Sequence, residues 1–183
     1  QGGNRLWRAP AKSDDRFLAA GQPRRQLTRG RMPMSQIDFY HLTQSDVETA
    51  LAMLVQKSLL AGKTVLVQCP QPAAEAIDDA LWVQEPDSWI PHGLDDAPGR
   101  DKAPVWISSD STDKTMTADF LFLLHGSERD DMRGFARVFN IFDGRSEAQV
   151  GQARSQWQSW REENGAEMRY FAQNDDGKWE QRG

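Results

Sequence analysis

Short runs of β-branched and apolar residues alternate along this chain with longer segments whose apolar residues recur at helical spacing. Residues 64–69 (Thr-Val-Leu-Val-Gln-Cys) are nearly all apolar, as expected for a strand that is covered on both faces. Apolar residues at helical spacing flank this run, at Val47, Leu51, Leu54 and Leu59 before it and at Ala74, Ile77 and Leu81 after it. Because parallel strands need a crossover connection, this pattern predicts a single α/β domain with a mostly parallel, Rossmann-like sheet flanked by helices.

The same alternation continues through the rest of the chain. We expect strands at residues 37–42, 103–108 and 118–124, an apolar run at 135–142, a long helix at 147–163 and a hairpin that starts at 168–172 and turns at Asp176-Gly177. Residues 85–103 are rich in Pro, Gly and Asp and predict a long connection. Ser45 or Thr43 is the expected N-cap of the first helix.

The charge is distributed unevenly. Residues 1–33 contain eight cationic and two acidic residues, a net charge of +6, and the whole chain carries -5, so residues 34–183 carry -11. A domain with this charge repels a phosphate backbone, which argues against broad DNA binding. We interpret residues 1–33 as a basic, disordered extension before a start near Met34, and residues 34–183 as the domain. A transit peptide or a nucleic-acid-binding arm is the alternative for the extension.

Several classes of protein are disfavoured by composition. No run reaches the length of a membrane helix and the start lacks the apolar segment of a signal peptide, so a soluble, cytoplasmic protein is expected. The single Cys69 and three His are too few and too scattered for an internal disulfide or a structural zinc site. We expect no metal and no cofactor.

Motifs for catalysis are weak. Gly62-Lys63-Thr64 resembles the end of a phosphate-binding loop, but that loop runs from a strand into a helix, and here the predicted order is the reverse. Cys69 and His41 end predicted strands, where α/β enzymes place active groups, yet no third orienting group is evident. The acidic pairs Asp78-Asp79 and Asp95-Asp96 are typical of a solvated surface. We therefore predict no catalytic residue, with a small α/β enzyme as the less favoured alternative.

Two groups of residues are typical of protein-binding surfaces. Trp82 ends the second predicted helix, and Trp89 lies with Pro91 and His92 in the loop 85–93, whose two prolines limit its freedom. Exposed rigid aromatic residues are good anchors for a partner. Capping of the sheet explains them equally well. On the predicted last helix, Val150, Arg154, Trp157 and Arg161 follow each other at spacings of 4, 3 and 4 and share one stripe. Such a stripe suits an acidic peptide with a hydrophobic end, or an amphipathic face that packs on the core.

The chain contains the segments 37–42 (Ile-Asp-Phe-Tyr-His-Leu), 64–69, 78–82 (Asp-Asp-Ala-Leu-Trp) and above all 87–94 (Asp-Ser-Trp-Ile-Pro-His-Gly-Leu). In residues and order these segments resemble a known family, the chi subunit of bacterial DNA polymerase III holoenzyme. Ala103-Pro104-Val105, Ala118-Asp119, Phe142-Asp143-Gly144 and a long helix with Arg154 and Trp157 follow in the same order. The similarity extends from about Gln36 to Trp179, and residues 1–33 match nothing in the family.

The resemblance implies a non-catalytic accessory protein in DNA replication. It implies that this protein joins the clamp-loader assembly through the psi subunit and captures the acidic, hydrophobic C-terminal tail of single-stranded DNA-binding protein. Trp82 and Trp89 match the aromatic positions that hold psi, or alternatively an XPD-like repair helicase. Arg154 matches the position that receives the tail, and Trp157 matches its aromatic neighbour. Trp89 replaces the more usual Phe, and Val150 and Gln158 stand where some members carry Lys, so tail capture is expected to be weaker or shifted toward Arg145, Arg154 and Arg161.

Overall fold

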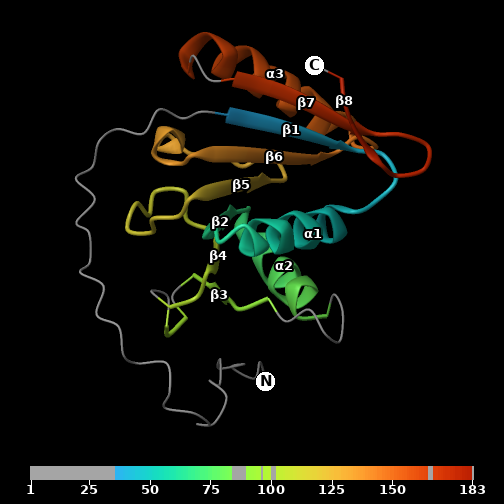
Figure 1. Ribbon diagram of the computed structural model, residues 1–183. Coiled ribbons are helices and arrows are strands. Elements are labelled where there is room, and N and C mark those ends of the chain that lie inside the picture. Colours follow the sequence, from blue (N-terminus) through green and yellow to red (C-terminus); the bar gives the residue numbers. More distant parts are fainter. Residues whose placement is uncertain (1–35, 84–89, 96, 100–101, 165–166, 183) are drawn as a thin grey trace.

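The computed structural model describes residues 36–83, 90–95, 97–99, 102–164 and 167–182 (Figure 1). The elements in chain order are β1 (Gln36–Leu42), α1 (Val47–Leu60), β2 (Val65–Gln68), α2 (Gln71–Val83), β3 (His92–Leu94), β4 (Val105–Ser108), β5 (Phe120–Leu124), the 3-10 helix η1 (Met132–Gly134), β6 (Arg137–Asp143), α3 (Glu147–Asn164), β7 (Glu167–Gln173) and β8 (Trp179–Gln181). The basic segment 1–33 and Trp89 lie outside the described residues.

One eight-stranded sheet in the order β3-β4-β2-β5-β6-β1-β7-β8 organises the domain. All neighbouring strands are parallel except β7 and β8, which form an antiparallel hairpin. The predicted α/β domain with a mostly parallel sheet is therefore confirmed, and so is the predicted hairpin.

Helices lie on both faces of the sheet, so the chain forms three layers (Figure 1). On one face, α1 contacts β2 and β6 while α2 contacts β3 and β4, and the core there is centred on Leu51, Val67 and Phe122. On the other face, α3 contacts β6 and covers a second core around Phe39 and Leu121. Burial on both faces explains why β2 and β5 consist almost entirely of apolar residues.

The start of α1 differs from the prediction in one detail. Asp46, not Ser45 or Thr43, is the N-cap: its carboxylate accepts a hydrogen bond from the Thr49 backbone N–H at 2.7 Å. A carboxylate at this position also interacts favourably with the positive end of the helix dipole. Ser45 is used elsewhere, since its hydroxyl accepts a hydrogen bond from Gln173 at 2.8 Å.

The segment Gly62-Lys63-Thr64 connects the end of α1 to β2. Gly62 has φ +70°, a left-handed conformation that favours glycine at the end of a helix. The Thr64 backbone N–H and hydroxyl both bond Asp119, which fixes the entry into β2. The order is helix into strand, so the segment lacks the strand-to-helix geometry of a phosphate-binding loop.

Within the predicted connection 85–103, the structure contains a short edge strand, β3. A Cβ at Gly93 would lie 2.1 Å from the Trp106 ring, so only glycine lets β3 approach β4 this closely. None of the helices in the described part of the chain is long and apolar enough to cross a membrane.

Candidate protein-binding surfaces

The first candidate surface lies where α3 runs beside β1 and β7. Arg154 projects from the exposed side of α3, while Val150 and Trp157 are half-buried against the core beneath the helix. The Trp157 ring meets Phe39 of β1 edge-on, with centroids 5.0 Å apart. Trp157 thus packs on the core and still exposes part of its ring beside Arg154, which combines the two interpretations of the helical stripe.

Residues from the strands complete this surface, and their spacing in the sequence does not predict that they meet there. His41 near the end of β1 stacks on Phe142 of β6, and its Nδ1 shares a hydrogen bond with the Tyr170 hydroxyl of β7. Arg182 follows β8, and its backbone N–H donates to the Tyr170 carbonyl at 2.8 Å. We name the surface formed by Arg154, Trp157, His41, Tyr170 and Arg182 the α3–β7 surface.

The charges of Arg154 and Arg182 both act on the same two side chains, His41 and Tyr170. Burial, and then the charges of Arg154 and Arg182, lower the pKa of His41, against smaller opposing effects of Asp143 and Gly144. Burial raises the pKa of Tyr170, which the same two arginines oppose. His41 is therefore largely neutral at pH 7, and the positive charge of the surface comes from the two arginines.

Arg154 and Arg182 differ in their pairing. The side chain of Arg154 forms no hydrogen bond or ion pair with any residue in the described part of the chain. Arg182 contacts Glu180 across 3.3 Å, and both side chains are about half exposed, so this pair is weak. Arg161, also predicted in the stripe, is exposed in the last turn of α3, and Arg145 is paired with Asp143.

The second candidate surface lies at the end of α2. Trp82 is half-buried, and its ring lies 4.7 Å from the ring of His92 in β3. Val83 beside it is 79% exposed, which is unusual for a large apolar side chain at the end of an otherwise well-packed helix. Pro91 is half-buried next to His92. We name Trp82, Val83, Pro91 and His92 the α2–β3 surface.

His92 anchors this surface to α2. Its Nδ1 bonds the Ile90 carbonyl at 2.7 Å, and its Nε2 lies 3.3 Å from Asp78 without the alignment of a good hydrogen bond. Burial works against protonation, but interactions with Asp78 and the Ile90 carbonyl outweigh it and raise the pKa of His92. The ring is held from both sides, so Trp82 rests on a fixed support. For Trp82 the sequence left open a partner anchor or a cap on the sheet, and the structure adds Val83 and the support by Asp78.

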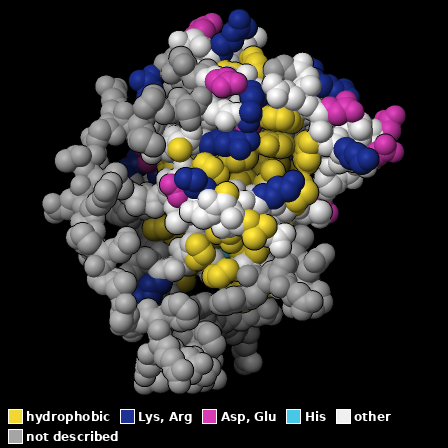
Figure 2. Space-filling model, in the orientation of Figure 1, with side chains coloured by type: hydrophobic (Ala, Val, Ile, Leu, Met, Phe, Trp, Pro, Cys, Tyr) yellow, Lys and Arg dark blue, Asp and Glu magenta, His cyan; other side chains and the backbone are white. Residues whose placement is uncertain are grey.

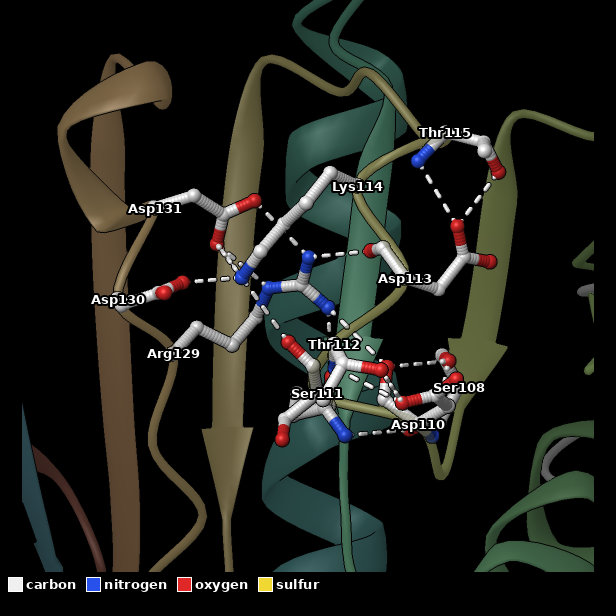
Figure 3. Close-up of polar contacts among 11 residues, drawn as sticks. Ser108, Asp110, Ser111, Thr112, Asp113, Lys114, Thr115, Arg129, Asp130 and Asp131 are labelled. Atoms are coloured by element: carbon white, nitrogen blue, oxygen red, sulfur yellow. Dashed lines mark hydrogen bonds and ion pairs between the residues drawn. The ribbon is translucent and has the colours of Figure 1, made fainter.

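The crevice beyond the carboxyl ends of the strands, where α/β folds commonly bind ligands, is occupied by protein groups (Figure 3). Arg129 is buried there and donates to the Gln68 side chain at 2.8 Å, to the Asp113 carbonyl at 2.6 Å and to both oxygens of Asp131. Lys114 is paired with Asp130 at the entrance. A cavity of about 630 Å³ lies beside this network, lined by loop residues and by Ser159 and Trp160 of α3.

Cys69 is placed as its structural interpretation predicted, whereas Asp78 and Asp95 are half-buried and paired rather than solvated, and Asp96 lies outside the described residues. Cys69 is buried, and burial raises the pKa of its thiol to about 12, which is the opposite of what a nucleophile requires. Asp95 bonds the backbone and hydroxyl of Ser109, and Asp78 faces His92. No cluster of three or more metal-ligating side chains occurs among the residues that the structure describes.

Comparison with known proteins shows the family of this chain. The family model described as DNA polymerase III chi subunit, HolC, matches residues 34–168. The DNA polymerase III subunit chi of Haemophilus influenzae is 28% identical over 127 residues, which are 67% of this chain and 88% of that protein. The subunit chi of Escherichia coli is 30% identical over 98 residues, 53% of this chain and 67% of that protein. The family match includes Trp82, Arg154 and Trp157 and ends before Tyr170 and Arg182. The chain belongs to the family of DNA polymerase III chi subunits.

Proposed function

We propose that this chi subunit is a non-catalytic bridge in the DNA polymerase III assembly. Its α2–β3 surface binds the psi subunit, and its α3–β7 surface binds the acidic C-terminal tail of single-stranded DNA-binding protein. The contact with template DNA is then indirect, which suits a domain whose residues from 34 onward carry a net charge of -11.

The observation that carries the tail site is the position of Arg154. Its exposed guanidinium lies beside the partly exposed Trp157 ring and close enough to His41 and Tyr170 to act on both of them. A peptide ending in an apolar residue needs a cation for its terminal carboxylate and an apolar surface for its last side chain. The α3–β7 surface offers both within one helical turn and the adjoining strand.

The α2–β3 surface supports the psi assignment in a different way. Val83 is 79% exposed and Trp82 is only half-buried, so the two side chains leave an apolar area that the described part of the chain does not cover. The rigid support of Trp82 by His92 limits the entropy that binding would cost, as is typical of an interface anchor. An XPD-like repair helicase would use the same surface and compete with psi.

A non-catalytic role is supported by the chemistry of the strand ends. The Cys69 thiol is held protonated by burial, and Arg129 fills the crevice in which a ligand of an α/β enzyme would lie. The protein needs no cofactor for the bridging role.

A reciprocal pair of variants tests the proposal. We expect Arg154→Ala to weaken binding of a tail peptide by roughly tenfold to one-hundredfold, the loss expected for one charge-assisted hydrogen-bonded contact, with psi binding unchanged. Trp82→Ala should weaken psi binding and leave the tail peptide unaffected, and Trp89→Ala is expected to act in the same direction. Titration calorimetry of each variant with the tail peptide and with psi measures both affinities. Tail binding by Arg154→Ala at wild-type strength would contradict the tail site, and psi binding that survives both Trp variants would contradict the α2–β3 site.

Binding experiments with the same wild-type and variant proteins distinguish the alternative partners and activities. Binding of the helicase that is lost in Trp82→Ala, in the absence of any psi binding, would favour the helicase as the partner of the α2–β3 surface. A nucleotide that binds with micromolar affinity would instead favour an α/β enzyme.

A further inference from the structure

Arg182 is the cation of the α3–β7 surface that does not come from α3. It follows β8, and the family match ends before it, at residue 168. The other cations near Arg154 are less well placed to act with it. Arg161 lies about two turns along the helix, roughly 10 Å away, and Arg145 is paired with Asp143 at 2.8 Å. A second cation close to Arg154 therefore comes from the sheet.

The alternation of β8 places Arg182 on the side of the sheet that carries α3. Trp179 meets the Tyr40 ring edge-on at 4.9 Å in the core on the α1 side. Figure 2 shows that side, with hydrophobic side chains gathered above α1 and Lys and Arg side chains among them. Since successive side chains of a strand point to opposite faces, Glu180 and then Arg182 point to the α3 side.

Arg182 lies opposite Tyr170 across the β7–β8 hairpin. Ala172 pairs with Glu180 in this hairpin. Two positions farther on, the same register brings Arg182 opposite Tyr170, and the Arg182 backbone N–H donates to the Tyr170 carbonyl at 2.8 Å. Side chains of directly opposed residues are neighbours on one face of a sheet. Arg182 is therefore a neighbour of Tyr170, whose hydroxyl in turn shares a hydrogen bond with His41.

The hairpin that carries Arg182 is held firmly against the end of β1. The side-chain oxygen of Gln173 accepts hydrogen bonds from three successive backbone N–H groups, at 3.0, 3.0 and 3.2 Å, in residues 43–45. Its side-chain nitrogen donates to the Ser45 hydroxyl at 2.8 Å. Because the strand is already fixed, binding of a peptide at Arg182 requires little further ordering of the backbone.

The charge of Arg182 acts on the same side chains as the charge of Arg154. Burial raises the pKa of Tyr170, and Arg182 opposes this rise more strongly than Arg154 does. Burial lowers the pKa of His41, and both arginines lower it further. The two cations therefore approach the His41–Tyr170 pair from two elements, Arg154 from the helix and Arg182 from the hairpin.

Cations outnumber acids at this place, although the domain as a whole is acidic. Arg182 contacts Glu180 across 3.3 Å, but both side chains are about half exposed and such a pair is weak. The charge of Asp143 is balanced by Arg145. Three further acids lie about two turns of α3 from Arg154, or act on Arg169 on the opposite face of the sheet: Glu147, Glu162 and Glu167. Arg154 and Arg182 therefore face one nearby acid, Glu180.

We infer that Arg182 is the second cation of the tail site and binds an acidic side chain that precedes the last residue of the tail. This inference rests on the proposed tail site. Arg154 and Trp157 are three positions apart on one helix, so a terminal residue can place its carboxylate on the first and its apolar side chain on the second. A peptide that continues from there over β7, which runs beside α3, brings its acidic side chains to Arg182 (Figure 1).

Titration calorimetry with two tail peptides at physiological salt tests the inference. The acidic peptide is the C-terminal tail of single-stranded DNA-binding protein. The neutral peptide has Asn and Gln in place of its acidic side chains and keeps the same apolar last residue with a free carboxylate. The full chain is used as wild type, Arg154→Gln, Arg182→Gln, Glu180→Gln and Lys178→Gln.

Two of these variants are matched. Arg182→Gln keeps the backbone hydrogen bond to Tyr170, and Lys178→Gln removes an exposed cation from the same hairpin. Charges more than about 8 Å apart are largely screened at this salt concentration. Lys178→Gln is therefore the control for a general effect of net charge.

We expect Arg182→Gln to weaken binding of the acidic peptide about threefold to tenfold and to leave binding of the neutral peptide unchanged. Arg154→Gln should weaken binding of both peptides, since both carry the terminal carboxylate. Glu180→Gln should strengthen binding of the acidic peptide about twofold, because Arg182 then loses a competing acid. Lys178→Gln should bind both peptides as wild type does.

Wild-type affinity of Arg182→Gln for the acidic peptide, or an equal loss for both peptides, would overturn the inference. A loss of the same size in Lys178→Gln would also overturn it, since net charge alone would then explain the effect. In each of these cases, weaker binding of both peptides by Arg154→Gln would leave the proposed tail site intact. Wild-type binding by Arg154→Gln would instead contradict the tail site itself.

Discussion

Arg129 donates a hydrogen bond at 2.8 Å to the side chain of Gln68, the last residue of β2, across 61 positions of the chain. Gln68 in turn donates to the Ser108 carbonyl at the end of β4, so the buried guanidinium ties two strand ends to the loops above them. Ligands of α/β proteins commonly bind at such strand ends. Here the position is used for a structural network, which fits a member of a family of accessory subunits.

A double-mutant cycle at this pair tests the structural role. Arg129→Met should destabilise the protein by about 3–5 kcal/mol, because it leaves Gln68 and two backbone carbonyls without their buried donor. Gln68→Met should cost less, and the coupling energy between the two changes should be about 2 kcal/mol. Urea denaturation of the four proteins measures it. Additive effects of the two substitutions would show that the hydrogen bond contributes little.

The α3–β7 surface makes a prediction about the titration of His41. Arg154 is one of the charges that lower the pKa of His41, so Arg154→Gln should move this pKa upward. Arg161→Gln removes the same charge from the last turn of α3 and should leave His41 unchanged. NMR titration of the histidine ring protons reads both variants. An equal response to both substitutions would mean that Arg154 does not face His41.

The α2–β3 surface should show a pH-dependent stability that depends on Asp78. The pKa of His92 is raised in the folded protein, so the protonated ring stabilises the fold below the ordinary value of 6.5. This contribution is lost as the pH rises from 6.5 through the raised pKa. In Asp78→Asn the contribution should be absent, so the difference in unfolding free energy from wild type should shrink as the pH rises through this window.

Denaturation midpoints between about pH 5.5 and about pH 8.5 measure that difference. Glu75→Gln, on an exposed position of α2, is the matched control and should follow the wild type. If Asp78→Asn ran parallel to wild type over the whole range, the ion pair with His92 would not contribute to folding.

The order of the strands and helices was predictable because each depends on local pattern. Val65–Gln68 is a buried apolar run, and α1 shows a repeating apolar face, so neither needs tertiary information. β3 was missed because it has only three residues and depends on a tertiary contact, the close approach of Gly93 to Trp106. The sequence predicted Ser45 or Thr43 as the N-cap of α1, and the N-cap is Asp46. The prediction was wrong because Thr, Ser and Asp are all good N-caps and all three occur within residues 43–46.

The candidate sites were predictable only in part. Val150, Arg154 and Trp157 lie on one helix, where spacing alone places them together. His41, Tyr170 and Arg182 reach the same surface from β1, β7 and the end of β8, and only the pairing of β7 with both β1 and β8 brings them there. The ion pairs of Asp38 with Arg137 and Arg169 have the same origin, since these three residues are separated by more than 30 positions and meet through strand register.

Affinity for the tail peptide should respond to charge at position 158. Gln158 is exposed on α3, so Gln158→Lys adds a cation without disturbing the core. We expect tail affinity to rise about two- to fivefold at low salt, and the gain to fade at high salt because exposed charges are screened. Val150→Lys adds the same charge but removes an apolar side chain from the packing beneath α3, so it should also lower the thermal stability.

Gln158→Glu is the control of opposite charge, and it should weaken tail binding about as much as Gln158→Lys strengthens it. Calorimetric titrations at two salt concentrations give the comparison, and an equal response to Lys and Glu at this position would place the tail away from this part of α3.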